Sequence, residues 1–226
     1  AASQRQELAN EAGNRRQDSA VEEAYFLVQV PNWAGITQPY WLELPREAAA
    51  YDWSEAGSEK SLAFAAPILT ATAVLEIAGR EISVTREVEY RQLDRIRGEV
   101  RRRIDVVPKV SVEPATDLMV VPVSTSSEPI ELLLTVRNNS AESVSGTAQF
   151  SLPPGWVLEP SFIEFSLEPA PATSTFSYQV TMPDSLQAGE YQLSGSAAIE
   201  GTVYRQAMQE IAYPHISTHR TYAQAS

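Results

Sequence analysis

The two histidines are the residues best suited to metal or acid–base chemistry, and they stand four positions apart. On a helix, the spacing of His215 and His219 would place both imidazoles on one face, as zinc sites require. Pro214 precedes them, however, the residues between them favour an extended chain, and no nearby aspartate or glutamate completes a ligand set. We therefore predict no metal site and no cofactor.

The sequence contains no arrangement of residues typical of nucleophilic or acid–base catalysis. A serine triad needs a positioned histidine, and both histidines fall in an expected tail; no Gly-x-Ser-x-Gly elbow and no glycine-rich phosphate loop occurs. The 29 acidic residues guarantee carboxylate pairs of the kind that hydrolyse glycosides, but only Asp52 beside Trp53, and Asp94 with Glu99, stand out. We interpret these as surface acids and a turn-stabilising Asp94, and we predict no catalytic residue.

Aromatic residues offer the best case for ligand binding. Exposed tryptophan and tyrosine rings can stack on the apolar faces of sugars, because they present rigid area at a small entropic cost. The alternative, which we favour, is a packed cluster in the core or between domains. Trp156 follows Pro153-Pro154-Gly155, and we interpret it as a plug at the end of a β-sandwich. The candidate glycan-binding residues all lie in the first quarter of the chain: Trp33, Tyr40, Trp41, Tyr51 and Trp53.

Charge and composition exclude several classes of partner. The net charge of −12 argues against nucleic acid, whose phosphates need clustered cations. Six arginines crowd into residues 91–103, but acidic residues are interleaved with them, so we interpret the segment as an ion-paired connector. The longest apolar stretch, residues 63–78, is interrupted by Pro67 and Glu76 and cannot form a transmembrane helix. The absence of cysteine excludes disulfides and thiolate metal sites.

A repeated pattern indicates two copies of one β-rich unit. Phe-Leu-Val-Gln-Val-Pro at residues 26–31 corresponds to Tyr-Gln-Val-Thr-Met-Pro at residues 178–183. Farther along, each copy contains a glycine, Gly79 or Gly201, which is followed by a similar string that ends in tyrosine, at residues 87–90 and 210–213. Internal repetition at this length indicates a tandem architecture more directly than any single local signal.

Alternating apolar residues and turn signals predict strands throughout both copies. In the first copy, a hairpin is expected around Gly79, with Ile82, Val84 and Val88 on its inner face. In the second copy, short strands separated by Pro, Gly and Asn turns indicate an immunoglobulin-like β-sandwich. Asn138-Asn139-Ser140 also matches the glycosylation sequon, but we interpret it as a turn. The eight strands expected in the second copy include residues 110–112, 119–121, 130–136, 148–152, 162–165, 176–182, 191–199 and 203–213.

The fold class predicted from these patterns is all-β, with two tandem immunoglobulin-like β-sandwiches, the first lacking its N-terminal strands. Only 25 residues precede Phe26, and they contain too few β-branched and aromatic residues to form the strands that the second copy has at this point. We expect the remainder of a longer parent chain, or a strand from a partner, to complete the first unit. The expected segments are a polar helical or mobile stretch at 1–23, the first sandwich at 24–107 with an excursion at 44–68, the second sandwich at 108–216 and a tail at 217–226.

Short strings in each copy resemble known bacterial families. Leu152-Pro153-Pro154-Gly155-Trp156 and Ala188-Gly189-Glu190-Tyr191 resemble the immunoglobulin-like modules associated with α-galactosidases. Pro39-Tyr40-Trp41-Leu42 and the later Tyr90-Arg91, Gly98-Glu99 and Arg101-Arg102 resemble the carboxy-terminal region of large LmbE-like (PIG-L) deacetylases. The resemblance covers about residues 24–216.

That resemblance implies an accessory role. The family removes acetyl groups from amino sugars with a zinc ion held by an amino-terminal α/β domain, and its His-Pro-Asp-Asp motif does not occur in this chain. We therefore expect a non-catalytic, extracytoplasmic accessory segment of a carbohydrate-active enzyme, acting as a spacer or a weak glycan contact. The alternative is an autonomous surface or periplasmic protein-interaction module that accepts a partner strand.

Overall fold

The computed structural model describes residues 25–31, 34–44, 49–123, 128–184, 186–213, 215–216 and 218–226, without the side chains of Glu55, Ser58 and Ser61. Contacts divide the chain into two units, residues 1–35 and residues 36–226. The described part of the second unit contains strands and short 3-10 segments but no α-helix, so the all-β fold class is confirmed. The domain boundary expected after residue 107 stays a prediction.

The described residues of the first unit run as an extended chain without a paired strand. Phe26, Val28 and Val30 alternate as the sequence predicts, and their exposed fractions are 49%, 50% and 58%. Leu27, on the opposite face, is 86% exposed. Alternation alone therefore extends this segment without burying it, because no strand among the described residues pairs with it.

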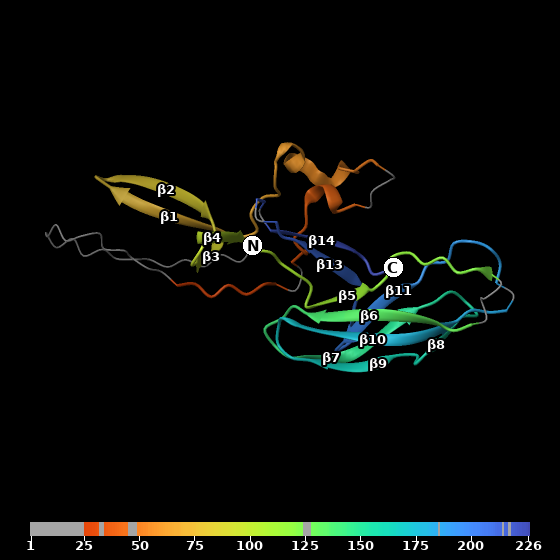
Figure 1. The fold of residues 1–226 in the computed structure, drawn as a ribbon. Helices are drawn as coiled ribbons and strands as arrows, with labels where there is room; N and C mark the ends of the chain where they lie inside the picture. The colour runs from red at the N-terminus through yellow and green to blue at the C-terminus, as the bar shows by residue number, and fades with distance from the viewer. Residues whose placement is uncertain are drawn as a thin grey trace. The chain divides into compact units, whose positions relative to one another are not determined.

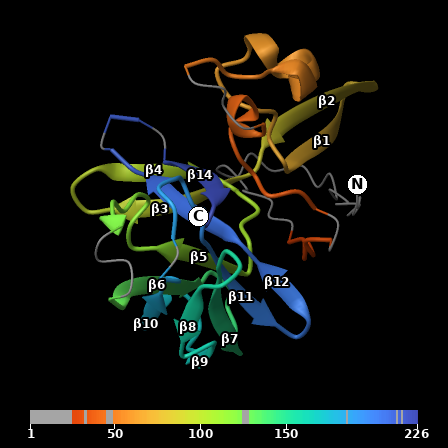
Figure 2. The same cartoon turned by 90° about the vertical axis from the view of Figure 1, so that its right-hand side faces the viewer.

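A β-sandwich of two four-stranded antiparallel sheets occupies residues 110–204 (Figure 1). The first sheet has the order β5-β6-β10-β8 and the second the order β12-β11-β7-β9. Figure 2 shows the same strands from the side, with the strands of the two sheets in separate layers. The strand bounds are β5 Val110–Pro114, β6 Ile130–Asn138, β7 Val144–Ser151, β8 Val157–Glu159, β9 Ile163–Leu167, β10 Ala172–Thr181, β11 Ser194–Ile199 and β12 Thr202–Tyr204.

The core of the sandwich comes from the inward-facing residues of both sheets. Leu134 of β6 and Tyr178 of β10 are fully buried against Phe150 of β7 and Ala197 of β11. The Tyr178 hydroxyl donates a hydrogen bond of 2.7 Å to the Ala148 carbonyl across the sandwich, and its ring meets Phe150 edge to face at 5.4 Å. Each fully buried side chain of this size contributes about 1.5–3 kcal/mol by leaving water, so the two sheets hold each other in place.

The Asn138 side chain closes one end of the sandwich. It is fully buried, and its amide nitrogen donates to the carbonyls of Glu142 and Glu168 at 2.7 and 2.8 Å. Its carbonyl oxygen accepts from the Ser140 amide at 2.9 Å and from the Ser140 hydroxyl at 2.8 Å. A buried amide with all of these partners stabilises the turn, as the sequence predicts for this Asn-Asn-Ser stretch.

The predicted tail at residues 217–226 is wrong for most of its length. His219–Gln224 form strand β14, which pairs antiparallel with β13 (Gln206–Ile211). Ala225 follows β14 and is 1% exposed; its carbonyl accepts from the Gly195 amide and its amide donates to the Arg205 carbonyl. A polar strand without its own apolar alternation is stabilised by these backbone hydrogen bonds, which sequence periodicity does not show.

Two further hairpins lie between residues 70 and 103. Strands β1 (Thr70–Ile77) and β2 (Arg80–Glu87) join through Ala78 and Gly79, whose φ angles are 51° and 73°. This is the predicted turn, because a two-residue hairpin loop with positive φ at both positions favours glycine. Strands β3 (Glu89–Asp94) and β4 (Gly98–Arg103) form the second hairpin, in place of the connector that the sequence predicts for the arginine-rich segment.

Short 3-10 segments form the excursion before β1. η1 (Tyr40–Leu42) and η2 (Ser54–Ser61) contact each other. The Leu42 amide donates to the Pro39 carbonyl at 2.9 Å, which closes the turn. The expected strand at Met119–Val121 is also wrong, since these residues have no strand partner.

The tandem arrangement is not confirmed. Among the described residues 36–107, each of the two hairpins is a separate two-stranded sheet, whereas residues 110–204 form a sandwich. Within the described residues, no helix is long and apolar enough to cross a membrane.

Candidate functional site

The candidate glycan-binding aromatics meet around Tyr40 in the η1–η2 segment. The Tyr40 side chain is 6% exposed, and its hydroxyl lies 3.3 Å from the Lys60 carbonyl and 3.1 Å from the Leu62 carbonyl, to which it donates. The Trp41 and Trp53 rings meet the Tyr40 ring nearly perpendicularly, with centroid distances of 5.0 and 6.2 Å. Tyr40 therefore holds the two 3-10 segments together and cannot itself offer a ring face to a ligand.

Two of the candidate rings remain accessible. Trp53 is 44% exposed and Tyr51 is 45% exposed, while Trp41 is half-buried. Trp33 lies outside the described residues. The Trp53 ring is held edge-on by Tyr40, and a partly exposed ring with a fixed orientation suits stacking on a sugar. The structure thus separates one buried ring, Tyr40, from two rings that are partly exposed, Tyr51 and Trp53.

Asp52 stands between the two accessible rings in the sequence and is held by the turn that follows. Its carboxylate accepts a hydrogen bond of 2.9 Å from the Ser54 amide, and this bond keeps the pKa of Asp52 below its ordinary value. The group is therefore ionised at neutral pH, where it can accept hydrogen bonds from sugar hydroxyls but cannot donate a proton.

Arg103, at the end of β4, connects the residues that follow η2 to the end of β2. The sequence analysis assigned this residue no separate role. Its Nε pairs with Glu87 at 2.6 Å, its Nη2 donates to the Ala65 carbonyl at 2.9 Å, and its guanidinium lies 5.7 Å from the centre of the Phe64 ring. A guanidinium with a planar set of donors can satisfy three such partners at once. The hairpin register does not show this ion pair, because it places Arg103 opposite Glu89, whereas Glu87 ends β2.

The other acids and the histidines do not assemble a reaction centre among the described residues. Asp94 accepts from the Ile96 and Arg97 amides at 2.8 Å each, which lowers its pKa, and Glu99 has a lowered pKa because Arg101 donates to it at 2.6 Å. His215 stacks on Tyr213 at 5.9 Å, while His219 lies in β14. The described residues contain no group of three metal-ligating side chains.

A second candidate surface, missed by the sequence analysis, is one face of the β1–β2 hairpin. Cross-strand pairing places Ala73, Leu75 and Ile77 of β1 on the same face as Ile82 and Val84 of β2. We call this the ribbon face. Leu75, Ile77 and Ile82 are 46%, 55% and 45% exposed. The alternation predicted for Ile82 and Val84 is confirmed, but their placement on an inner face is wrong, because no described residue covers this face, and Val88 lies beyond the end of β2.

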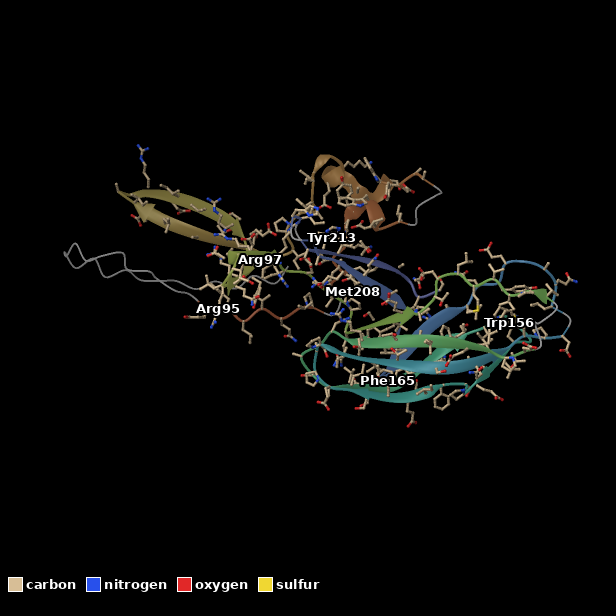
Figure 3. All side chains as sticks on the ribbon, viewed as in Figure 1. Arg95, Arg97, Trp156, Phe165, Met208 and Tyr213 are labelled. Carbon is tan, nitrogen blue, oxygen red and sulfur yellow. The ribbon has the colours of Figure 1, made fainter. Side chains whose placement is uncertain are left out.

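Trp156 lies at the end of the sandwich, as expected for a plug (Figure 3). Its ring is half-buried and lies 5.5 Å from the Tyr191 ring. No protein-family model matches this chain, and no curated protein matches it either.

Proposed function

We propose that this chain is a non-catalytic accessory segment of a larger bacterial carbohydrate-active protein, in which the sandwich is a rigid spacer and the ribbon face docks on a partner β-sheet. The observation that carries this proposal is the exposure of the ribbon face. The corresponding face of the β11–β12 hairpin is buried by the opposite sheet of the sandwich, whereas no described strand covers the ribbon face.

The β1–β2 and β11–β12 hairpins have the same turn. Ala78-Gly79 has φ angles of 51° and 73°, and Glu200-Gly201 has φ angles of 49° and 83°. Aligned at these glycines, Ile77 corresponds to Ile199 and Leu75 corresponds to Ala197. This equivalence supports the internal repeat and the proposal that a partner sheet covers the ribbon face.

The buried hairpin shows what such a face packs against. Ala197 is fully buried and Ile199 is 4% exposed, because β5 and β6 cover them. At Gly195, a Cβ would lie 2.5 Å from the Leu134 Cδ1 atom of the facing sheet. The residue of the first hairpin that corresponds to Gly195 is Ala73. A methyl group is present at Ala73, whereas at Gly195 it would collide with Leu134.

The free edge of β1 supports docking by strand addition. In the sandwich, β11 pairs with β12 on one side and with β7 on the other, so that Ala197 faces both Tyr204 and Ala148. Among the described residues, β1 pairs only with β2. An unpaired edge presents backbone donors and acceptors to an incoming antiparallel strand. This edge also favours the alternative function, an autonomous surface or periplasmic protein-interaction module.

Three further features support the accessory role. In the strand orders β5-β6-β10-β8 and β12-β11-β7-β9, the first two strands of the sandwich are neighbours in one sheet and the third lies in the other, as in an immunoglobulin-like arrangement. The strings that resemble deacetylase and α-galactosidase accessory regions favour an extracytoplasmic parent enzyme acting on amino sugars. Trp53 and Tyr51, with Asp52 between them, are suited to a weak glycan contact.

The docking proposal is tested by hydrogen exchange. The reading frame upstream of residue 1 is sequenced, and any longer product is expressed beside the 226-residue chain. We expect the β1 amides to exchange quickly in the chain alone and to be protected in the longer product, whose added part contains a histidine- and aspartate-rich α/β domain. Unchanged exchange at β1 would contradict docking, and a gene that starts at residue 1 would favour the autonomous module.

The glycan contact is tested by titrating amino-sugar oligomers while tryptophan emission is followed. We expect a change at millimolar ligand that Trp53→Ala removes and Trp156→Phe preserves. A flat response would leave the aromatic cluster as packing.

A further inference from the structure

The tip of the β3–β4 hairpin carries two of the most exposed aliphatic side chains in the described structure, Ile96 in the loop and Leu93 near the end of β3. Ile96 is 95% exposed and Leu93 is 84% exposed. Burying an exposed aliphatic side chain of this size is favourable, so a hairpin tip that keeps two of them in water is suited to a partner that removes them from it. We call Leu93, Arg95, Ile96 and Arg97 the apex.

The apex is held in place by its own turn. The Asp94 carboxylate accepts hydrogen bonds of 2.8 Å from the Ile96 and Arg97 amides, and Gly98 closes the loop with a φ of 78°. Such an aspartate turn is a stable local structure. The aliphatic side chains are therefore presented by a preorganised loop, which lowers the entropic cost of binding.

The charge of the hairpin is opposite to that of the chain. Residues 89–103 contain six arginines and three acidic residues, whereas the whole chain has a net charge of −12. The acids are already engaged, since Glu89 and Glu99 pair with Arg101 and Asp94 binds the turn. The guanidinium groups of four arginines make no hydrogen bond or ion pair with other described side chains, namely those of Arg91, Arg95, Arg97 and Arg102.

The free arginines are arranged around the aliphatic pair. Arg95 and Arg97 flank Ile96 on the loop, and Figure 3 labels both at the β3–β4 hairpin. Arg91 and Arg102 lie farther along the strands, where Arg102 pairs across the hairpin with Tyr90, a residue 56% exposed. Ile96 thus lies at the tip between Arg95 and Arg97, and Leu93 follows on β3. Arg91 and Arg102 lie nearer the base of the hairpin, where Arg102 is paired with Tyr90.

Exposed aliphatic side chains with cations around them, and an aromatic ring nearer the base, match the polarity profile of a lipid surface. We propose that the apex docks on an anionic lipid bilayer, with Leu93 and Ile96 entering the acyl boundary and the free arginines meeting the headgroup phosphates. Arginine and tyrosine are both stable at this depth, because each has an apolar body and a polar end. A soluble polyanion would satisfy the arginines but would leave Leu93 and Ile96 in water.

The acidic remainder of the chain does not prevent this contact. Strands of six residues extend about 20 Å, whereas charge interactions in water are screened over about 10 Å at 0.1 M salt. Both faces of the hairpin are largely exposed beyond its base. Anionic lipid therefore attracts the apex while the acidic residues elsewhere disfavour other orientations. This inference is independent of the docking role of the ribbon face.

Vesicle co-sedimentation tests the proposal with the full 226-residue chain. The probes are vesicles of phosphatidylcholine alone and of equal parts phosphatidylcholine and phosphatidylglycerol. We expect binding to the anionic vesicles only, weakened about fivefold for each arginine removed, as Arg95→Gln/Arg97→Gln would show. Leu93→Ser/Ile96→Ser should weaken binding at least about tenfold, since both changes remove apolar surface from the acyl boundary.

Matched controls separate the apex from general exposure and general charge. Leu118→Ser/Val120→Ser removes two aliphatic side chains that are 80% and 86% exposed but stand beside Asp117. Arg80→Gln/Arg86→Gln removes two exposed arginines of the β1–β2 hairpin. Both should bind the anionic vesicles as the unmodified chain does.

Three results would overturn the proposal. These are absence of binding to anionic vesicles at millimolar lipid, an equal loss of binding in the control variants, and equal binding to soluble polyglutamate that Leu93→Ser/Ile96→Ser leaves unchanged. All the substituted side chains are exposed, and circular dichroism verifies that each variant keeps its strand content.

Discussion

The β1–β2 and β11–β12 hairpins share a turn and an alternating pattern but differ completely in burial. Every residue of β1 is exposed, whereas β11 has four buried residues out of six. The two turns have the same pair of positive φ angles. Local chemistry therefore determines that a hairpin forms and where it turns, while burial depends on strands far away in the sequence that supply a facing sheet.

Equivalent isoleucines give the largest expected contrast between the two hairpins. Ile199→Ala removes a side chain that is 4% exposed and should lower the free energy of unfolding by about 2–5 kcal/mol. Ile77→Ala, at a position 55% exposed, should change it by less than about 0.5 kcal/mol. Urea unfolding measures both, and an equal cost would mean that the ribbon face is covered in solution.

Small residues that face the opposite sheet provide the second contrast. Gly195→Val should cost about 1–3 kcal/mol, because the added atoms meet the fully buried Leu134. Ala73→Val should be neutral or slightly stabilising, since valine favours strands and this face is open. Thermal unfolding of the two variants checks the prediction, and similar losses at both sites would contradict the alignment of the hairpins.

The turn glycines should behave alike, which makes them the control for the comparison. Gly201→Ala and Gly79→Ala each place a Cβ at a positive φ, with no other atom within 4 Å to add a clash. Each should cost about 1 kcal/mol of hairpin stability. The loss at Gly201 should appear in global unfolding, whereas the loss at Gly79 should appear only as faster hydrogen exchange in β1 and β2.

Two tyrosines provide the smallest contrast. Tyr178→Phe removes the hydrogen bond to Ala148 and should cost about 1 kcal/mol. The Tyr222 hydroxyl is buried without a hydrogen-bond partner among the described residues, so Tyr222→Phe should be neutral or stabilising. Urea unfolding at pH 7 distinguishes the two, and a larger loss for Tyr222→Phe would show a partner for its hydroxyl.

The same two tyrosines predict how the free energy of unfolding depends on pH in the alkaline range. Burial raises the pKa of both phenols to about 12, above the ordinary value of 10. The unfolded chain therefore loses these protons first, so stability should be constant below pH 10 and should fall as the pH rises towards 12. Tyr178→Phe should reduce this slope, whereas stability that rises above pH 10 would contradict the shifts.

Strand positions were predictable wherever apolar alternation and turn residues agreed. Ile130–Val136 and the hairpin at Gly79 are examples, since side chains of period two and a glycine turn both indicate the same structure. Strand β14 was not predictable, because His219–Gln224 have no apolar alternation and owe their conformation to pairing with β13. Met119–Val121 failed for the converse reason, since β-favouring residues without a paired strand do not form one.

The aromatic site was predictable in its location but not in its internal roles. The sequence placed Tyr40, Trp41, Tyr51 and Trp53 together as candidates, and the structure brings Tyr40, Trp41 and Trp53 into contact. Which ring is buried depends on the Lys60 and Leu62 carbonyls that receive the Tyr40 hydroxyl. The positions of backbone carbonyls cannot be read from the sequence. The cluster of arginines in the apex hairpin was visible in the sequence, but only the structure shows which of these arginines form ion pairs and which do not.

The hydrogen bonds of Asn138 imply that any glycosylation of this residue must precede folding of the sandwich. A transferase that attaches sugar to an asparagine must reach its amide nitrogen, which in the folded sandwich is committed to Glu142 and Glu168. A sugar found on Asn138 would therefore record that the enzyme met the chain before the sandwich closed. The occupancy of that one amide would report the order of modification and folding in any cell that makes this protein.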